Sequence, residues 1–359
     1  MLFYIFIALT LVSIAVYVTF LLLSAFFAAK RSGQLLILFA LLVIGLGFVI
    51  SSSLIRSFYS LVIRIFYIFC SLGLGLLFYL TIFAIIFQAC RLIKLPVSRI
   101  ILARIGVGLA VSLFLVGIFD ANMTRVKNIS VTMDGLPLNW QGKKIIQISD
   151  VHLGVVYGVG YLHRQVDRIN ALNPDLIVIT GDLFDGESSR LLEFGPELSK
   201  LKAKEGIVYV PGNHETYLGL DKVEALLKGL HFKILRDEAV NIKGLEIIGL
   251  DFNRFAVNNA DRNIKNLSSY NGQARLLLNH TPTEILFAKK LKVDLQLSGH
   301  SHRGQMFPLS LMTQLIYGKY QYGLYTEGNY NIYTSSGLGS WGPPVRTFNP
   351  SEIVEITIK

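Results

Sequence analysis

The sequence predicts an α/β domain over residues 141–359, preceded by a helical membrane region over residues 1–120 and by a short linker and first strand over residues 121–140. Three observations support this prediction. Charged residues are scarce in the first part, short apolar runs alternate with amphipathic stretches in the second, and polar side chains follow the ends of those runs. Alternation of this kind is typical of an α/β domain with buried sheets.

The charge of the chain is distributed unequally between these parts. Of the formal net charge of +10, residues 1–120 contribute +7, because they contain one acidic residue, Asp120, and eight basic residues. The mean hydropathy is +0.51 and 52% of the residues are hydrophobic, which is more than a soluble protein usually shows. Since most of the positive charge flanks apolar segments, whereas nucleic acid binding needs a basic patch on a folded domain, we expect no nucleic acid partner.

Long uncharged stretches predict four transmembrane helices. Three of them, Leu2–Ala29, Gln34–Ile55 and Ile65–Cys90, exceed the ~18 apolar residues that suggest a span. The fourth, Ile105–Phe119, is shorter and spans only if Arg104 extends to the interface, so that the helix begins near Ile100. A cleaved signal peptide is the alternative for the first stretch, but it lacks a basic start and is too long.

The basic residues of the loops predict the orientation of these helices. Six follow the first and third helices, namely Lys30, Arg31, Arg91, Lys94, Arg99 and Arg104. Four lie on the other side, namely Arg56, Arg64, Arg125 and Lys127. Because basic loops favour the cytoplasm, we expect a multi-pass protein of a bacterial-type cell membrane with an extracytoplasmic catalytic domain. If the short fourth stretch does not cross, the domain is cytoplasmic.

The second domain is expected to contain nine strands and four helices. The strands are Lys143–Ser149, Leu176–Thr180, Ile207–Val210, Phe232–Leu235, Leu245–Leu250, Arg275–Leu278, Leu295–Leu297, Asn331–Thr334 and Ile353–Ile358. The helices are Tyr161–Leu172, Leu191–Lys202, Asp221–Leu230 and Thr283–Leu291. Short, almost wholly apolar runs such as LIVIT predict buried strands, and the longer amphipathic stretches between them predict helices.

Polar side chains follow five of these strands, where ligands bind in open α/β sheets. The five motifs are SDVH with Asp150 and His152, GDLFD with Asp182 and Asp185, GNHE with Asn213 and His214, NH with His280, and GHSH with His300 and His302. Glycine or proline stands beside the polar group in four of the five, which allows sharp turns and close backbone approach.

These motifs predict a site for two metal ions. They hold five of the seven histidines, and such a cluster would be costly to assemble unless a cation bound it. The seven expected donors are Asp150, His152, Asp182, Asn213, His280, His300 and His302. Seven exceeds the three protein ligands of a catalytic zinc site and suits two ions that share a carboxylate. Mixed oxygen and imidazole donors favour Mn, Fe or Zn.

Two such ions suit displacement at phosphorus. They generate a hydroxide near neutral pH and neutralise the phosphoryl oxygens. The order D-x-H, G-D-x-x-D, G-N-H-E, H and G-H-x-H resembles the calcineurin-like metallophosphoesterases over about residues 140–359. The segments GHSHRGQ and GLGSWGPPVR are similar to the membrane-associated YkuE/YaeI-like branch. The resemblance implies a four-layer α/β/β/α sandwich.

The resemblance also implies a role for each motif residue. Asp150, His152 and His302 would bind the first ion, Asn213, His280 and His300 the second, and Asp182 both. His214 would act on the phosphate as a transition-state stabiliser or general acid, oriented by Asp185, which agrees with the usual arrangement of a general acid. Arg303 stands where the branch usually has glycine, and its guanidinium either points to solvent or binds a substrate phosphate.

The sequence says less about the substrate. The stretch Gln314–Tyr325 holds four tyrosines and is either an ordinary packed loop or a surface that contacts the lipid bilayer. We expect a metal-bridging hydroxide to hydrolyse a phosphodiester or pyrophosphate of a lipid- or envelope-associated substrate. Two alternatives remain: a UDP-2,3-diacylglucosamine-type pyrophosphate hydrolase if the domain is cytoplasmic, and a non-catalytic, membrane-tethered module that binds a phosphorylated ligand.

Overall fold

The computed structural model describes residues 2–185, 190–252 and 262–359, with side chains described from residue 13 except at 56 and 57. Its contacts divide the chain into two compact units. One comprises Met1–Phe119 and Gly342–Thr347, and the other comprises Asp120–Trp341 and Phe348–Lys359. A segment close to the C-terminus therefore belongs to the unit formed by the first third of the chain.

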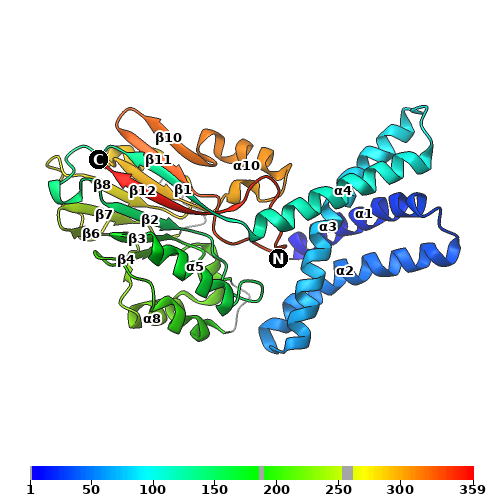
Figure 1. Ribbon diagram of the computed structural model, residues 1–359, viewed down its shortest axis with the longest axis horizontal. Coiled ribbons are helices and arrows are strands. Elements are labelled where there is room, and N and C mark those ends of the chain that lie inside the picture. The colour runs from blue at the N-terminus through cyan, green and yellow to red at the C-terminus, as the bar shows by residue number, and fades with distance from the viewer. Residues whose placement is uncertain (1, 186–189, 253–261) are drawn as a thin grey trace. The chain divides into compact units, whose positions relative to one another are not determined.

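The first unit is built from apolar helices (Figure 1). They are α1 (Leu2–Phe26), α2 (Arg31–Ser57), α3 (Leu61–Leu92) and α4 (Arg99–Asn122), whose last three residues belong to the second unit. Within the described residues, three segments are long and apolar enough to cross a membrane, and the apolar part described in α1 is shorter. The expected count of four spans is thus matched only roughly. The fourth helix begins earlier than the stretch Ile105–Phe119, so Arg99 and Arg104 lie within it.

The segment Gly342–Thr347 packs against α3 and α4 through two glycines. A Cβ atom on Gly117 would lie 2.3 Å from Cγ1 of Val345, and one on Gly75 would lie 2.8 Å from Cγ2 of the same valine. The backbone N–H of Arg346 donates a hydrogen bond to the carbonyl of Gly117 at 2.8 Å. Only glycine at these two helix positions lets the segment approach so closely.

The second unit contains two six-stranded sheets. The first has the order β1 (Thr124–Val131), β12 (Ser351–Ile358), β2 (Lys144–Ile148), β3 (Leu176–Thr180), β4 (Ile207–Val210) and β5 (Lys233–Ile234). The second has the order β10 (Gly323–Glu327), β11 (Tyr330–Thr334), β9 (Leu295–Ser298), β8 (Arg275–Leu278), β7 (Leu245–Gly249) and β6 (Glu238–Ile242). Strands β2, β3 and β4 run parallel, as do β7, β8, β9 and β11, so their carboxyl ends share an edge within each sheet.

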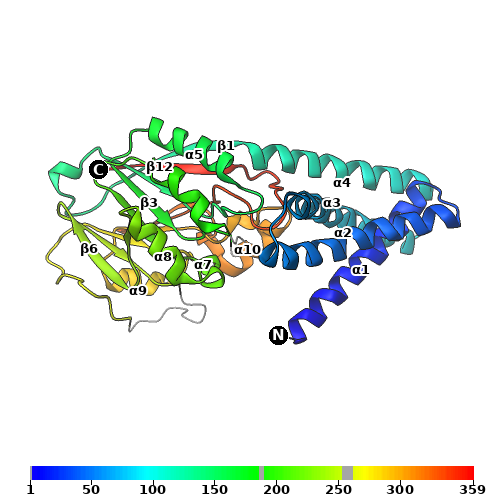
Figure 2. The same cartoon turned by 90° about the horizontal axis from the view of Figure 1, so that it is seen from below.

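The sheets pack face to face between helices, which confirms the four-layer α/β/β/α sandwich. Side chains such as Val178 of β3 and Leu276 of β8 form the core between the sheets. Helices α5 (Val159–Ala171), α6 (Gly195–Leu198) and α8 (Leu220–Gly229) cover the first sheet, and Figure 2 shows α5 and α8 lying over it. Helix α9 (Ile285–Lys290) covers the second.

Several elements differ from the sequence prediction. The helix expected over Leu191–Lys202 is a 3-10 turn, η2 (Leu191–Phe194), followed by the four-residue α6, which begins with Gly195 and a proline. Elements that the sequence analysis did not identify are β6, β10, α7 (Asn213–Leu218) and α10 (Leu309–Tyr317), whereas β1 lies within residues 121–140, where a first strand was expected. Three further 3-10 turns are η1 (Leu138–Trp140), η3 (His302–Gly304) and η4 (Gly318–Tyr320).

Candidate metal centre

The five polar motifs meet where the parallel strands of both sheets end. Three follow β2, β3 and β4 of the first sheet, and two follow β8 and β9 of the second. The structure brings together the seven residues expected to bind metal and the two expected to act on the phosphate, His214 and Asp185. Because each motif directly follows a buried strand, the sheet fixes the backbone from which its side chains project.

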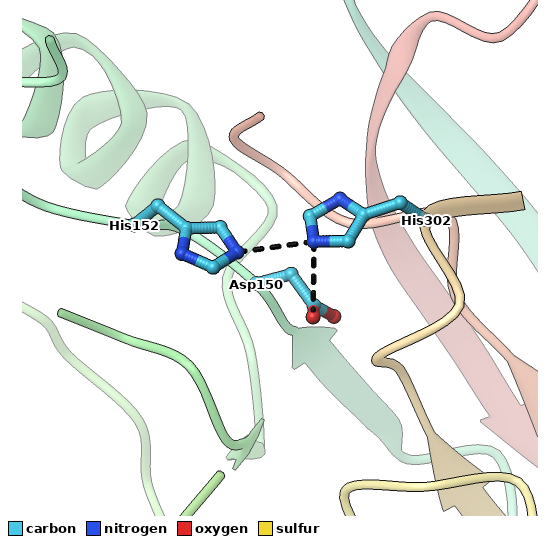
Figure 3. Close-up of side chains that lie close together, drawn as sticks. All are labelled: Asp150, His152 and His302. Atoms are coloured by element: carbon cyan, nitrogen blue, oxygen red, sulfur yellow. Dashed lines mark hydrogen bonds and ion pairs between the residues drawn. The ribbon is translucent and has the colours of Figure 1, made fainter. Parts of the chain in front are cut away.

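Asp150, His152 and His302 form the first group (Figure 3). The Nε2 atoms of His152 and His302 are 3.0 Å apart, and Nε2 of His302 is 3.4 Å from Oδ1 of Asp150. All three side chains are buried, with at most 8% of each residue exposed. One oxygen and two nitrogen atoms thus converge on one point away from bulk solvent.

Asp182, Asn213, His280 and His300 form the second group. Nε2 of His280 lies 3.1 Å from Oδ1 of Asn213, 3.1 Å from Nδ1 of His300 and 3.3 Å from Oδ2 of Asp182. The same Oδ2 atom is 3.9 Å from Nε2 of His152 in the first group. The carboxylate of Asp182 therefore lies between the two groups.

The chemistry of these donors fits divalent cations. Two imidazole nitrogens 3.0 Å apart can share one proton at most, whereas a cation attracts both lone pairs. In the second group, Nδ1 of His280 lies 2.8 Å from the carbonyl of Thr180 and donates to it, so Nε2 is the atom that would bind a cation in exchange for its proton. Imidazole nitrogens mixed with carboxylate and amide oxygens suit Mn, Fe or Zn.

Burial sets the protonation of several donors. It lowers the pKa of His152 to about 4, and burial together with the charge of His280 lowers the pKa of His300 to about 3. Burial acts to raise the pKa of Asp182, but the charge of His280 and its hydrogen bond outweigh it and hold that pKa well below the usual range. At neutral pH His152 and His300 are neutral and Asp182 is ionised, which are the forms that bind metals.

The backbone at the donors is strained. Asp150, His152, Asp182, His300 and His302 all have positive φ, between 46° and 67°. This region is uncommon for residues other than glycine, and such residues cluster at functional sites. Hydrogen bonds hold the conformation, since the N–H of His300 donates to Asp150 at 3.0 Å.

Two glycines allow the chain to pass against the donors. A Cβ atom on Gly212 would lie 2.2 Å from Oδ1 of Asp182, and one on Gly299 would lie 2.2 Å from Oδ2 of Asp150. Any larger residue at either position would displace a carboxylate of the cluster.

His214 lies beside the cluster and is paired with Asp185. Its Nδ1 is 3.4 Å from Oδ1 of Asp185, and its ring centroid is 4.6 Å from that of His152. Burial opposes a charge on His214, but the hydrogen bond with Asp185 and the charge of Asp182 outweigh it, so the pKa of His214 is raised. Arg303, in contrast, stacks on Tyr322, with its guanidinium carbon 4.5 Å from the ring centroid.

Sequence reasoning did not identify two residues that support the site. Glu215 is fully buried and accepts hydrogen bonds from three backbone N–H groups, those of Asp182, Phe184 and Gly212, at 2.7–3.1 Å. Its place in the GNHE motif, in the first turn of α7, was the available signal. Asn349 donates a hydrogen bond to the carbonyl of His302 at 2.5 Å, and nothing near it in the sequence indicates this contact.

The motifs lie largely within residues 143–304, which match the family model described as calcineurin-like phosphoesterase. An uncharacterized metallophosphoesterase of Campylobacter jejuni is 34% identical over 272 residues, which cover 73% of this chain and 71% of that protein. The chain belongs to the calcineurin-like metallophosphoesterases.

The matches to two further relatives cover smaller shares of both proteins. One from Helicobacter pylori is 34% identical over 242 residues, covering 65% of this chain and 64% of that protein. A transmembrane protein with metallophosphoesterase domain from Danio rerio is 31% identical over 257 residues, covering 67% of this chain and 58% of that protein. In both cases the match spans less than two thirds of the relative.

Proposed function

We propose that this metallophosphoesterase is anchored in a membrane and uses two divalent metal ions to hydrolyse a phosphodiester or pyrophosphate of a lipid- or envelope-associated substrate. One observation carries the proposal of two ions. The carboxylate of Asp182 lies between two groups of donors, 3.3 Å from His280 on one side and 3.9 Å from His152 on the other.

The donors divide naturally between the two ions. In this proposal Asp150, His152 and His302 would hold the first ion, Asn213, His280 and His300 would hold the second, and Asp182 would serve both. Manganese, iron or zinc ions held in this way would supply a hydroxide from water near neutral pH and would neutralise charge on the phosphoryl oxygens.

The residues of the chain position the substrate and the proton. His214 donates a hydrogen bond to an oxygen of the phosphoester, and Asp185 holds the imidazole ring in the required orientation through Nδ1. The raised pKa of His214 supports its role as a donor. Arg303 remains a candidate for binding a substrate phosphate, since a guanidinium that stacks on Tyr322 keeps its N–H donors at its edge.

The apolar helices support the membrane anchor. The uncharged stretch Ile105–Phe119 alone is short for a membrane span, but helix α4, which contains it, is 24 residues long and is long enough to cross. With four crossings, the basic loop residues favour a multi-pass protein of a bacterial-type membrane with an extracytoplasmic catalytic unit.

Cysteine labelling tests this orientation. Leu192→Cys introduces a thiol on η2 of the catalytic unit, at a residue that is 75% exposed. A membrane-impermeant maleimide should label it in intact spheroplasts above the level of the parent protein, which contains only Cys70 and Cys90. Labelling only after lysis would place the domain in the cytoplasm and would favour the UDP-2,3-diacylglucosamine-type activity.

The catalytic proposal is tested with the full chain in detergent micelles. Bis-p-nitrophenyl phosphate, p-nitrophenyl phosphate and a lipid-linked phosphodiester would each be incubated with Mn²⁺ or with EDTA. Asp182→Asn should lose the Mn²⁺-dependent turnover and part of the bound metal, whereas Asp221→Asn, on the exposed start of α8, should retain both. Turnover that survives EDTA and Asp182→Asn would refute the metal assignment. Two bound metals without turnover of any ester would favour the phospho-ligand-binding module.

A further inference from the structure

Helix α10 displays an uncharged apolar face to solvent. Its sequence is LSLMTQLIY, and none of its nine described residues is buried. Leu311, Met312, Leu315 and Ile316 are 54%, 56%, 87% and 67% exposed. Their spacing places them on one side of the helix. Contiguous apolar surface of this kind marks an interaction site in most proteins.

Aromatic residues extend this surface beyond the helix. Phe307 precedes α10, and its ring centroid is 6.4 Å from that of Phe348, with 45% and 60% of the two residues exposed. We call Phe307, Leu311, Met312, Leu315, Ile316 and Phe348 the α10 face. The neighbouring tyrosines contribute less, because the hydroxyls of Tyr320 and Tyr322 donate hydrogen bonds to Glu327 and Glu352 and both residues are partly buried.

Both ends of α10 are packed against the metal centre. A Cβ atom on Gly304 would lie 2.3 Å from the backbone nitrogen of Ser310, so the start of the helix rests on the turn that carries His302. At the other end, the ring centroid of Tyr317 is 6.2 Å from that of His300. A partner that binds the α10 face therefore lies next to His300 and His302, two of the candidate metal ligands.

We infer that the α10 face inserts into the surface of a lipid bilayer and holds the metal centre at the level of the lipid phosphates. The catalytic unit follows directly on α4, a helix of membrane-spanning length, and only Met123 separates that helix from β1. Helices that lie in a membrane surface bury an apolar face about 5–10 Å deep.

The charge around α10 matches an anionic lipid surface. From Arg303 to Thr326 the chain has no acidic residue, and its two basic residues, Arg303 and Lys319, flank the helix. Lys319 also lies 3.5 Å from the carboxylate of Glu327, so Arg303 is the basic residue of this stretch without a carboxylate partner among the described ion pairs. A basic residue beside an apolar helix favours membranes that contain anionic phospholipids. The inference rests on the proposed function and narrows it, because the substrate becomes a phosphoester whose apolar part stays in the bilayer.

Fluorescence quenching tests the insertion without relying on activity. The full chain would be reconstituted in phosphatidylcholine–phosphatidylglycerol vesicles with or without brominated acyl chains. Tryptophan emission added by Leu315→Trp should be quenched about twofold by the brominated lipid. The control is Leu138→Trp, since Leu138 is 83% exposed and lies outside the α10 face, and its added emission should be unaffected. Equal quenching of the two variants, or none of Leu315→Trp, would overturn the inference.

Activity then tests the consequence for the substrate. Leu311→Gln/Leu315→Gln should lower turnover of a vesicle-embedded phosphodiester about tenfold and leave turnover of bis-p-nitrophenyl phosphate unchanged, whereas Leu138→Gln should change neither. A parallel loss on both substrates would contradict the inference. If the parent protein hydrolyses no ester, the proposed function fails, while the quenching result still decides the insertion. If Leu311→Gln/Leu315→Gln instead turns a dimer into a monomer, the α10 face joins two copies of the chain.

Discussion

Glu215 holds the backbone turn that carries Asp182, because its Oε2 accepts a hydrogen bond of 3.0 Å from the backbone N–H of Asp182. The same oxygen accepts from Gly212 at 2.7 Å, and Oε1 accepts from Phe184 at 3.1 Å. One buried side chain thereby ties the turn after β3 to the turn after β4. These turns carry Asp182 and Asn213, which are assigned to the same ion.

Replacing Glu215 should therefore damage both stability and metal binding. Glu215→Ala leaves three buried N–H groups without their acceptor, and each such group costs about 1–3 kcal/mol. We expect a fall of several kcal/mol in the free energy of unfolding and a reduced metal content, measured by thermal unfolding and by elemental analysis of the purified full chain. Glu193→Gln, on an exposed part of η2, is the control and should change neither. An unchanged metal content in folded Glu215→Ala would show that the two turns hold their positions without this carboxylate.

His214 should contribute to turnover without holding a metal. Removal of a general acid or of a hydrogen-bond donor to the phosphate lowers rates about 10²–10⁴-fold. We expect His214→Asn to lower kcat in this range with an unchanged metal content, and Asp185→Asn to have a smaller effect of the same kind. His163→Asn provides the control, since that imidazole is exposed on α5. If His214→Asn loses one metal equivalent, the imidazole is a ligand, and the role assigned to it is wrong.

The sequence predicts the position of the site better than its surroundings. Asp150, Asp182 and His280 each follow a short apolar run, so knowing where the strands end is enough to place them. Contacts between distant residues leave no such local pattern. The hydrogen bond from Asn349 to His302 and the stacking of Arg303 on Tyr322 depend on the packed fold.

Helix α10 shows a second limit of sequence reasoning. Its residues Leu311 and Leu315 have helical spacing, but the interpretation of Gln314–Tyr325 relied on its four tyrosines, and the hydroxyls of Tyr320 and Tyr322 are hydrogen-bonded to glutamates. Whether the apolar residues of α10 are exposed to solvent depends on which of them the rest of the folded chain covers. Periodicity alone could not distinguish an aliphatic face turned to solvent from one turned to the core.

A buried ion pair remote from the site should make stability depend on pH. Nε of Arg275 lies 2.6 Å from Oε2 of Glu246, and both residues are at most 2% exposed. Burial acts to raise the pKa of Glu246, but hydrogen bonds from Ser268 and Arg275 outweigh it and lower the pKa. A carboxyl group whose pKa is lower in the folded state stabilises the fold above its unfolded pKa of about 4.3, and this contribution is lost as the pH falls through the folded value.

Glu246→Gln should consequently lower the Tm equally at pH 7 and pH 5, and progressively less as the pH falls below about 4.3. Thermal unfolding of the full chain at pH 7, 5, 4 and 3 measures the difference from the parent protein. Glu193→Gln serves as the control because its carboxylate is exposed, and its Tm should follow that of the parent at every pH. A difference between Glu246→Gln and the parent that stays constant from pH 5 down to pH 3 would mean that the pKa of Glu246 is not lowered by the fold in this range.

Two glycines of α4 allow a matched test of how the segment Gly342–Thr347 is held. A Cβ atom on Gly117 would lie 2.3 Å from Cγ1 of Val345, whereas one on Gly108 would meet no atom within 4 Å. Alanine in a helix is otherwise more stable than glycine by about 0.5–1 kcal/mol. Gly108→Ala should thus be neutral or slightly stabilising, and Gly117→Ala should destabilise the full chain by about 1–3 kcal/mol through overpacking.

The clash can be removed from the other side. The double variant Gly117→Ala/Val345→Ala lacks the valine Cγ atoms that would meet the new Cβ. Its destabilisation should therefore be smaller than the sum of the two single effects. A double-mutant cycle of Tm values, measured in nanodiscs, gives this coupling. Gly108→Ala/Val345→Ala should show additive effects, since these residues share no close contact. Equal and additive effects at both glycines would mean that Val345 does not lie against α4 in the folded protein.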